Sequence, residues 1–383
     1  MSTLFLEPLD VLFLRGNKLF GDAGSFGEAL IPPWPSVAAG ALRSRMLADA
    51  GVDLAAFARG QLEHPALGRP SAPGPFTVTA FYVARRSENG RIELLLPPPA
   101  DLVVAEHDGK QVTVRALKPT ALPTEAGIQS SAPLPLLPVL TEAERSKPAG
   151  GYWLKESGWR QYLRGETPGA HDLVKSGELW SFDHRVGVGL QATTRRADDG
   201  KLFSAQAVAL KQGVGFIAAV RGAEPPTSGT VRLGGDGRAA ALHAAQLDWP
   251  EPDYNTIARE RRCRLVLTSP GIFERGWLPT GAAEPSQNGV PFELHGVRGR
   301  IVAAAVPRAE VVSGWDLAQW QPKPAHRVAP TGSVYWLELD GSVTADALRQ
   351  WVDNGLWRDP CEDAARRAEG FNRCMLAAWS DGR

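Results

Sequence analysis

The chain has 383 residues, of which 43% are apolar and 22% are charged, as in a soluble globular protein long enough for two domains. Its 42 basic and 42 acidic residues cancel, which excludes a surface that binds nucleic acid through strong overall charge. Any RNA contact must therefore come from local groups of arginine. Three widely spaced cysteines predict a reducing compartment and no zinc site. With no signal-peptide pattern and no apolar run of transmembrane length, the sequence predicts a cytoplasmic protein.

The amino-terminal region predicts a strand, a loop, a bend and a helix. Residues 9–16 are almost continuously apolar and predict a buried strand, and residues 17–24 carry two glycines in a loop. A proline-rich bend at 31–35 precedes Ser36, the expected N-cap of a helix over 37–47. The helix-start amides, with Arg15, Arg43 and Arg45, are able to hold a phosphate. The alternative is a strand packed on a helix, with solvated arginines.

The next region predicts two hairpins and an irregular stretch. A strand over 76–83 and another over 92–96 flank the turn signal Asn89-Gly90, and a second hairpin joins 102–104 to 112–114 through Asp108-Gly109. Residues 119–140 contain five prolines and predict a long irregular loop. Residues 153–164 predict a short helix.

The middle of the chain predicts a hairpin with a basic end. A strand over 180–190 is followed by a turn at Asp199-Gly200 and a return strand to residue 210. Its cations, at 185, 195 and 196, are placed near RNA, although a surface hairpin with solvated arginines fits as well. Two further strands flank residues 233–238, where a single carboxylate, Asp236, followed by glycine predicts a turn and not a metal site.

The carboxy-terminal region begins near residue 250, where we place a domain boundary. A helical or irregular stretch near 253–262 and a strand over 264–269 are followed by a long strand over 301–312 that breaks at Pro307. An extended basic segment over 321–336 leads into a strand. A helix over 344–351 is expected to be capped by Thr344 or Ser342.

Six blocks, which follow one another along the chain in the order typical of the family, resemble the third subunit of the type III-B CRISPR (Cmr) effector complex. This family belongs to the RAMP superfamily of RNA-binding Cas proteins. The most specific are Pro8-x-Asp10 with Phe13-x-Arg15, Phe20 and Pro32-Pro33 leading into residues 40–43, and Pro322-Lys323-Pro324 leading into residues 330–335. The others are Arg185-Val186-Gly187, the Gly-Gly-x-Gly-Arg turn at 234–238, Gly276-Trp277-x-Pro279, and Gly314-Trp315-Asp316. The closing loop departs from the pattern, because asparagine stands at 372 where glycine is expected and alanine stands at 377 and 378. Asparagine tolerates left-handed φ, so we expect the turn to form.

The resemblance implies an α+β fold of two ferredoxin-like (RRM-like) RAMP domains with long loop insertions, over residues 1–250 and 251–383. It implies a non-catalytic subunit, without cofactor or metal, that holds the 5′ handle of crRNA and docks the large polymerase-like subunit and a backbone RAMP subunit. Bases of the handle would be stacked and its phosphates gripped by arginine. The residues expected to bind RNA are Arg15, Lys18, Phe20, Arg43, Arg185, Arg195, Arg196, Lys323, His326 and Arg327.

Two other functions stay open at this stage. Related RAMP-fold endoribonucleases cut RNA without metal through a histidine, and His184 beside Arg185 is the candidate for that chemistry. The equivalent subunit of a type III-A complex has a similar role. The dipeptides His107-Asp108 and His171-Asp172 are interpreted as surface residues, and the sequence contains no Walker loop, dinucleotide fingerprint or Gly-x-Ser-x-Gly elbow.

Overall fold

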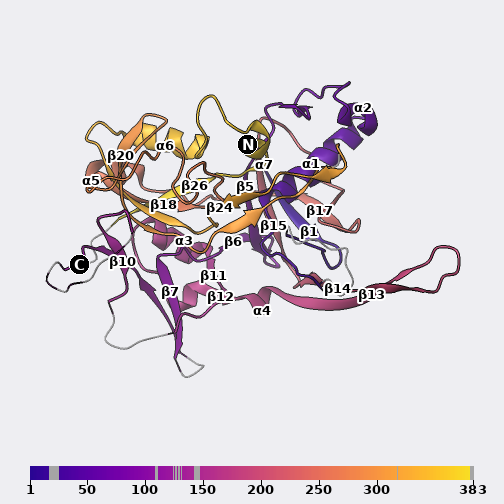
Figure 1. Ribbon diagram of the computed structural model, residues 1–383, viewed down its shortest axis with the longest axis horizontal. Helices are drawn as coiled ribbons and strands as arrows, with labels where there is room; N and C mark the ends of the chain where they lie inside the picture. The colour runs from indigo at the N-terminus through magenta and orange to yellow at the C-terminus, as the bar shows by residue number, and fades with distance from the viewer. Residues whose placement is uncertain are drawn as a thin grey trace.

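The computed structural model describes residues 1–16, 26–107, 111–123, 125, 127, 130, 132–141, 147–316 and 318–379, with the backbone alone at Asp199 and Gly200. Two antiparallel sheets and a projecting hairpin make up the molecule (Figure 1). The predicted loop at 17–24 and the predicted turn at Asp108-Gly109 lie outside the described residues.

The first sheet contains eight strands in the order β12-β11-β6-β5-β15-β1-β17-β16. Apolar side chains of one face, with Leu4, Leu6 and Phe216 fully buried, form a core with Ala38 and Leu42 of α1 (Pro35–Asp49). The predicted hairpins on either side of Asn89-Gly90 and of residues 233–238 are both confirmed. The strands are β1 (Ser2–Pro8), β5 (Thr77–Arg86), β6 (Ile92–Leu96), β11 (Tyr152–Lys155), β12 (Leu173–Lys175), β15 (Val214–Arg221), β16 (Thr230–Arg232) and β17 (Ala239–Ala244).

The predicted amino-terminal strand was placed too late in the chain. The regular strand is β1, Ser2–Pro8, whereas residues 12, 13 and 15 make isolated bridges to three different segments. Ser36 is likewise inside α1 and not at its N-cap, because Pro35 is the first helical residue. Proline suits that position, since its missing N–H would have no partner there and its φ is already helical.

The second sheet contains five strands in the order β19-β20-β25-β18-β26. Helices α5 (Tyr254–Glu260) and α6 (Ala345–Asn354) cover one face, with Ile257, Leu348 and Trp351 buried against it. The hydroxyl of Thr344 accepts a hydrogen bond from the Ala347 amide, which confirms one of the two expected caps. The strands are β18 (Arg262–Leu267), β19 (Val290–Leu294), β20 (Val297–Ala305), β25 (Val334–Leu339) and β26 (Cys374–Ala378).

The remaining elements connect and decorate the two sheets. The predicted break at Pro307 is confirmed, because it separates β20 from β21 (Glu310–Val312). The hairpin of β7 (Leu102–His107) and β8 (Gln111–Ala116) is also confirmed. The others are β2 (Phe26–Gly27), α2 (Leu54–Ala58), β3 (Gly68–Arg69), β4 (Ala72–Pro73), η2 (Ala170–Asp172), α4 (Ser176–Leu179), β22 (Trp315–Asp316), β23 (Gln321–Pro322), β24 (His326–Val328) and α7 (Ala364–Glu369).

Two expectations about the insertion between β5 and β15 were wrong in part. The stretch at 119–140 is not irregular throughout, because β9 (Lys118–Thr120) pairs with β10 (Leu137–Val139). The helix expected over 153–164 is α3 (Glu156–Leu163), and the residues before it join the first sheet as β11. Prolines at 119 and 138 are opposite each other in the middle of the short β9–β10 ladder. The sheet has only these two strands, so both are edge strands, which is where proline is tolerated.

A long hairpin of β13 (Trp180–Leu190) and β14 (Ala197–Leu210) extends away from both sheets (Figure 1). Its turn is at residues 191–196, where the Gln191 amide bonds to the Arg196 carbonyl, and not at Asp199-Gly200 as predicted. Asp199 and Gly200 lie inside β14, which shows that the ladder and not the dipeptide sets the turn.

The two sheets share an apolar layer. Phe5, Tyr82 and Ile217 of the first sheet are in one core cluster with Val302 and Trp336 of the second. A buried polar contact lies next to this layer: Arg264 of β18 donates to Asp101 (2.8 Å) and to the Tyr162 carbonyl (3.0 Å), and the Tyr162 hydroxyl donates to Asp101 (2.9 Å). Burial raises the pKa of Tyr162 well above its ordinary value, so the phenol keeps the proton that it donates.

Asp101→Ala is expected to lower the free energy of unfolding by about 3–5 kcal/mol, because it leaves the Arg264 guanidinium buried without its carboxylate. Equilibrium urea unfolding measures this. Glu293→Ala, which removes an exposed ion pair with Arg298, is the control and should leave the unfolding midpoint unchanged. Equal unfolding midpoints for the two variants would show that the buried contact between Asp101 and Arg264 does not stabilise the fold.

The closing loop keeps its turn with asparagine in place of glycine. Asn372 has φ 58° and is fully buried. Its side chain accepts from the Ile272 amide (2.6 Å) and donates to the carbonyls of Ile272 (3.1 Å) and Leu356 (3.2 Å). The side chain therefore joins three loops, which a glycine would not do.

Asn372→Ala is expected to destabilise the protein by about 1 kcal/mol more than Asn372→Gly, because both variants lose the three side-chain hydrogen bonds but only alanine is strained at positive φ. Paired unfolding curves of the two variants give the difference. A glycine variant as unstable as the alanine variant would show that backbone strain is unimportant there.

Candidate nucleic-acid interface

Three arginines surround the ring of Phe13. The guanidinium carbons of Arg15, Arg185 and Arg238 lie 6.0, 5.7 and 5.4 Å from the centre of the Phe13 ring. The three arginines come from the amino-terminal segment, from β13 and from the turn between β16 and β17. We call these four residues the Phe13 cluster.

Backbone contacts on both sides hold Phe13 in place. Leu12 exchanges two hydrogen bonds with Val208 of β14 (2.9 and 2.8 Å), and the Gly235 amide donates to the Phe13 carbonyl (2.8 Å). Gly234 has φ +78°, and a Cβ there would lie 2.8 Å from that carbonyl oxygen. The glycines of this turn therefore allow the chain to pass close to Phe13, while Ala205 and Ala207 of β14 leave room for its ring.

Aspartates partly neutralise the Phe13 cluster. Arg185 donates twice to Asp183 (2.9 and 2.8 Å), and Arg238 donates to Asp10 (2.5 Å). The Nε of Arg238 is buried and has no hydrogen-bond partner among the described residues. Because Asp10 and Asp183 are well exposed, these pairs are of the kind that contributes little to stability and exchanges readily.

An aromatic stack lies on the other face of the hairpin base. The rings of His184 and Phe26 are nearly parallel (14°), with centres 6.3 Å apart. Successive residues of a strand point to opposite faces, so His184 and Arg185 diverge, one towards Phe26 and the other towards Phe13. This arrangement does not bring a general acid–base and a charge-stabilising cation to one reacting phosphate.

The other predicted cations occupy two further places. Arg195 and Arg196 are exposed at the tip of the β13–β14 hairpin, where Arg195 has φ 53°. Arg43, Lys323 and the β24 residues His326 and Arg327 lie in the packed body of the chain, with Arg327 exposed. Lys18 and Phe20 are outside the described residues.

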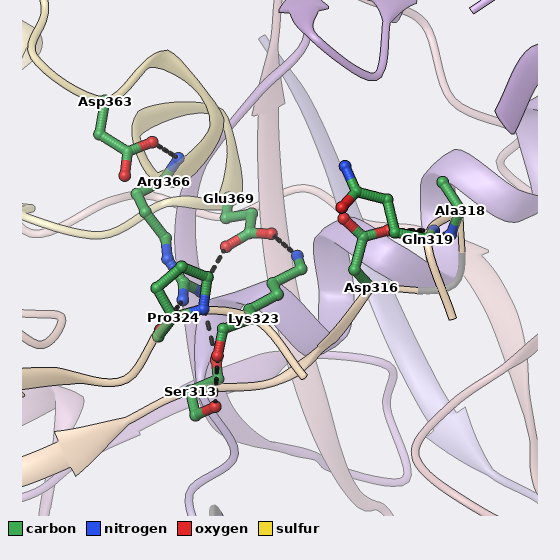
Figure 2. Close-up of polar contacts among 9 residues, drawn as sticks. All are labelled: Ser313, Asp316, Ala318, Gln319, Lys323, Pro324, Asp363, Arg366 and Glu369. Atoms are coloured by element: carbon green, nitrogen blue, oxygen red, sulfur yellow. Dashed lines mark hydrogen bonds and ion pairs between the residues drawn. The ribbon is translucent and has the colours of Figure 1, made fainter. Parts of the chain in front are cut away.

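Lys323 belongs to a buried ionic network, drawn in Figure 2. Its ammonium contacts Glu369 of α7, a carboxylate that is only 3% exposed. Arg366 also contacts Glu369 (3.0 Å) and donates to the carbonyls of Ser313 (3.3 Å) and Pro324 (3.2 Å). The Pro-Lys-Pro segment is therefore fastened to α7, and the charge of Lys323 is directed inwards.

Arg43 of α1 lies within range of the charge of the same carboxylate. Its guanidinium carbon lies 5.1 Å from the centre of the Phe76 ring. Burial lowers the pKa of Arg43, and the negative charge of Glu369 partly offsets this effect. A carboxylate introduced at position 43 would stand near Glu369, so charge reversal at this position tests the fold as well as RNA binding.

Sequence reasoning selected Arg15 and Arg185, which the structure brings to one ring. It did not select Phe13, Arg238, Arg366 or Glu369. The Gly-Gly-x-Gly-Arg turn was the available signal for Arg238, because a turn that approaches Phe13 so closely carries its terminal arginine with it. No comparable signal marked Glu369. Within the described residues, no group of three or more histidine, cysteine or acidic side chains is arranged to hold a metal ion, and no helix has the length and apolarity needed to cross a membrane.

The fold and this surface define a mixed α/β protein of antiparallel sheets with few helices, which presents arginines around an aromatic ring. A family model described as CRISPR-associated protein (Cas_Cmr3) matches residues 4–379. The chain therefore belongs to the Cmr3 family of CRISPR-associated proteins. No curated protein sequence matches it.

The chain is also similar, at low sequence identity, to chains of solved structures. A chain of a type III-B Cmr-β complex bound to cognate target RNA is 13% identical, with 88% of this chain and 86% of that chain covered and a TM-score of 0.46. A chain of the Cmr-β complex with target RNA and AMPPnP is 14% identical, with 98% of each chain covered and a TM-score of 0.47. A chain of the type III-A Csm3–Csm4 subcomplex is 10% identical, with 88% and 92% covered and a TM-score of 0.34. The family assignment rests on the family model.

Glu369→Gln is expected to lower the free energy of unfolding by about 3 kcal/mol, because Lys323 and Arg366 then share no carboxylate in a buried setting. Thermal or urea unfolding measures the loss. The matched control is Glu166→Gln, which weakens an exposed pair with Arg164 and should have no effect. If both variants unfold like the parent, the network does not fasten the Pro-Lys-Pro segment.

Proposed function

We propose that this chain is the RNA-binding, non-catalytic subunit of a type III-B CRISPR interference complex in the cytoplasm. In this role it holds the 5′ handle of crRNA and docks the large polymerase-like subunit and a backbone RAMP subunit. Membership of the Cmr3 family supports the proposed place in a type III-B complex. The proposed binding of RNA rests on the Phe13 cluster.

The Phe13 cluster has the chemistry that a single-stranded RNA end requires. Guanidinium groups donate in pairs to phosphate oxygens, and exposed aromatic or guanidinium planes stack on unpaired bases. Arg15, Arg185 and Arg238 supply the first kind of contact, and the exposed Phe26–His184 stack supplies a surface for the second. Arg195 and Arg196, at the tip of the same hairpin, would follow the RNA backbone further along.

The proposed architecture is two ferredoxin-like domains, at residues 1–250 and 251–383. In the first sheet, four neighbouring strands have the order β17-β1-β15-β5. The two central strands, β1 and β15, are the first and third of the four along the chain, and α1 lies between β1 and β5 in the sequence. In the second sheet β26-β18-β25-β20 has the same arrangement, with α6 between β25 and β26. This is the strand order of the β-α-β-β-α-β unit, with one crossover helix kept in each half.

The two alternatives have less support. An endoribonuclease that uses His184 needs Arg185 on the same face of β13, and the two side chains diverge. The equivalent type III-A subunit is less well supported than the type III-B one, since the family model that matches is Cas_Cmr3.

Charge reversal at Arg15, Arg185 and Arg238 together is expected to reduce the crRNA recovered per mole of tagged chain at least tenfold from cells that express the whole operon. Each lost phosphate contact should also make the dependence of log K on log salt shallower by about 0.7. Arg91→Glu, at the exposed β5–β6 turn, is the control. Circular dichroism and the melting temperature establish that the triple variant is folded. If the folded variant recovers as much crRNA as the parent, these three arginines do not bind the RNA.

A further inference from the structure

Two tryptophans are exposed together at the tip of a small hairpin. All twelve tryptophans lie within the described residues, and Trp315 (49% exposed) and Trp320 (74% exposed) are the two that are largely open to solvent. Their rings contact each other edge to face, with centres 6.0 Å apart and planes at 87°. A pair of indoles in water leaves a large apolar area uncovered, which is costly unless a partner covers it.

The hairpin holds the tryptophans in one orientation. Trp315 of β22 is opposite Pro322 of β23. Inside the loop, the carboxylate of Asp316 accepts hydrogen bonds from the amides of Ala318 (2.8 Å) and Gln319 (3.2 Å), as Figure 2 shows. Trp320 has φ 54°, a left-handed conformation that is unfavourable for a bulky side chain and that the surrounding turn must maintain.

The base of the hairpin is anchored to the rest of the protein. The Ser313 hydroxyl donates to the Lys323 carbonyl (2.9 Å), and the Lys323 amide donates to the Gly314 carbonyl (2.9 Å). Arg366 of α7 donates hydrogen bonds to the carbonyls of Ser313 and Pro324, which lie immediately before and after the hairpin. A loop whose base is so well bound presents its tip with little loss of conformational entropy on binding.

The charges around the tip favour a protein partner over RNA. Residues 315–322 contain one carboxylate and no lysine or arginine. Surfaces that stack single-stranded RNA combine aromatic rings with a cationic groove for the phosphates. The nearest cation along the chain, Lys323, is paired with the buried Glu369. Exposed aromatic side chains in a segment that lacks lysine and arginine are instead typical of the centres of protein interfaces.

We propose that the Trp315–Trp320 pair inserts into an apolar pocket on a neighbouring protein subunit that also offers acceptors for the indole N–H groups. This inference rests on the proposed place of the chain in a multi-subunit complex. It assigns the β22–β23 hairpin to protein docking and leaves RNA to the Phe13 cluster.

The test places the photoreactive amino acid p-benzoyl-phenylalanine at position 320 in the tagged full-length chain, co-expressed with the rest of the operon. The assembled particle is purified and irradiated, and the adduct is identified by mass spectrometry with and without RNase. We expect an RNase-resistant adduct with one protein subunit that is present in stoichiometric amount. An RNA adduct, or an assembled particle that gives no adduct, would overturn the proposal.

A second measurement uses Trp315→Ser/Trp320→Ser in the same co-expression. Recovery of the docked subunit should fall about 30-fold or more, as for an interface hot spot, while crRNA per mole of chain stays within twofold. Leu54→Ser, which removes an exposed leucine of α2, is the matched control and should change neither. Full recovery of every subunit with the serine pair would overturn the proposal. Failure of the parent chain to recover crRNA would count against the RNA-binding function alone.

Discussion

The packing of Phe13 determines where the cations of the proposed RNA surface stand. Its ring rests on Ala205 and Ala207 of β14, and its backbone is bonded through Leu12 to Val208 and directly to Gly235. A two-stranded hairpin is only marginally stable alone, so β13 and β14 need this crossing segment at their base. The same contact that attaches the hairpin to the protein therefore brings arginines from three segments to one aromatic ring.

The exposure of the counter-ions distinguishes cations that are available to RNA from cations that hold the fold together. Arg185 and Arg238 are paired with exposed aspartates, and a phosphate can replace a carboxylate there without leaving a buried charge. Lys323 and Arg366 are paired with Glu369, which is buried, and withdrawing either cation would leave that carboxylate uncompensated. The neutral net charge agrees with such a division, because few of the basic residues need to face RNA.

Local patterns predicted the strands that alternate and the turns that contain glycine, as at Asn89-Gly90 and in the turn at 234–238. They failed where distant contacts decide the conformation. Asp199-Gly200 lies within β14, because the ladder from Trp180–Leu210 to Val188–Leu202 fixes the hairpin before its turn is reached. The direction of Lys323 was equally hidden, since its partner Glu369 is 46 residues away and no periodicity connects them.

The described surface thus separates two kinds of chemistry on two excursions of the chain. The base of the β13–β14 hairpin combines guanidinium groups with aromatic rings, which suits a polyanion with unpaired bases. The β22–β23 hairpin offers aromatic rings and contains no lysine or arginine, which suits an apolar pocket. In the proposed role, the chain holds one end of an RNA and also joins protein neighbours. This separation suits that role, because neither partner then competes for the side chains that the other requires.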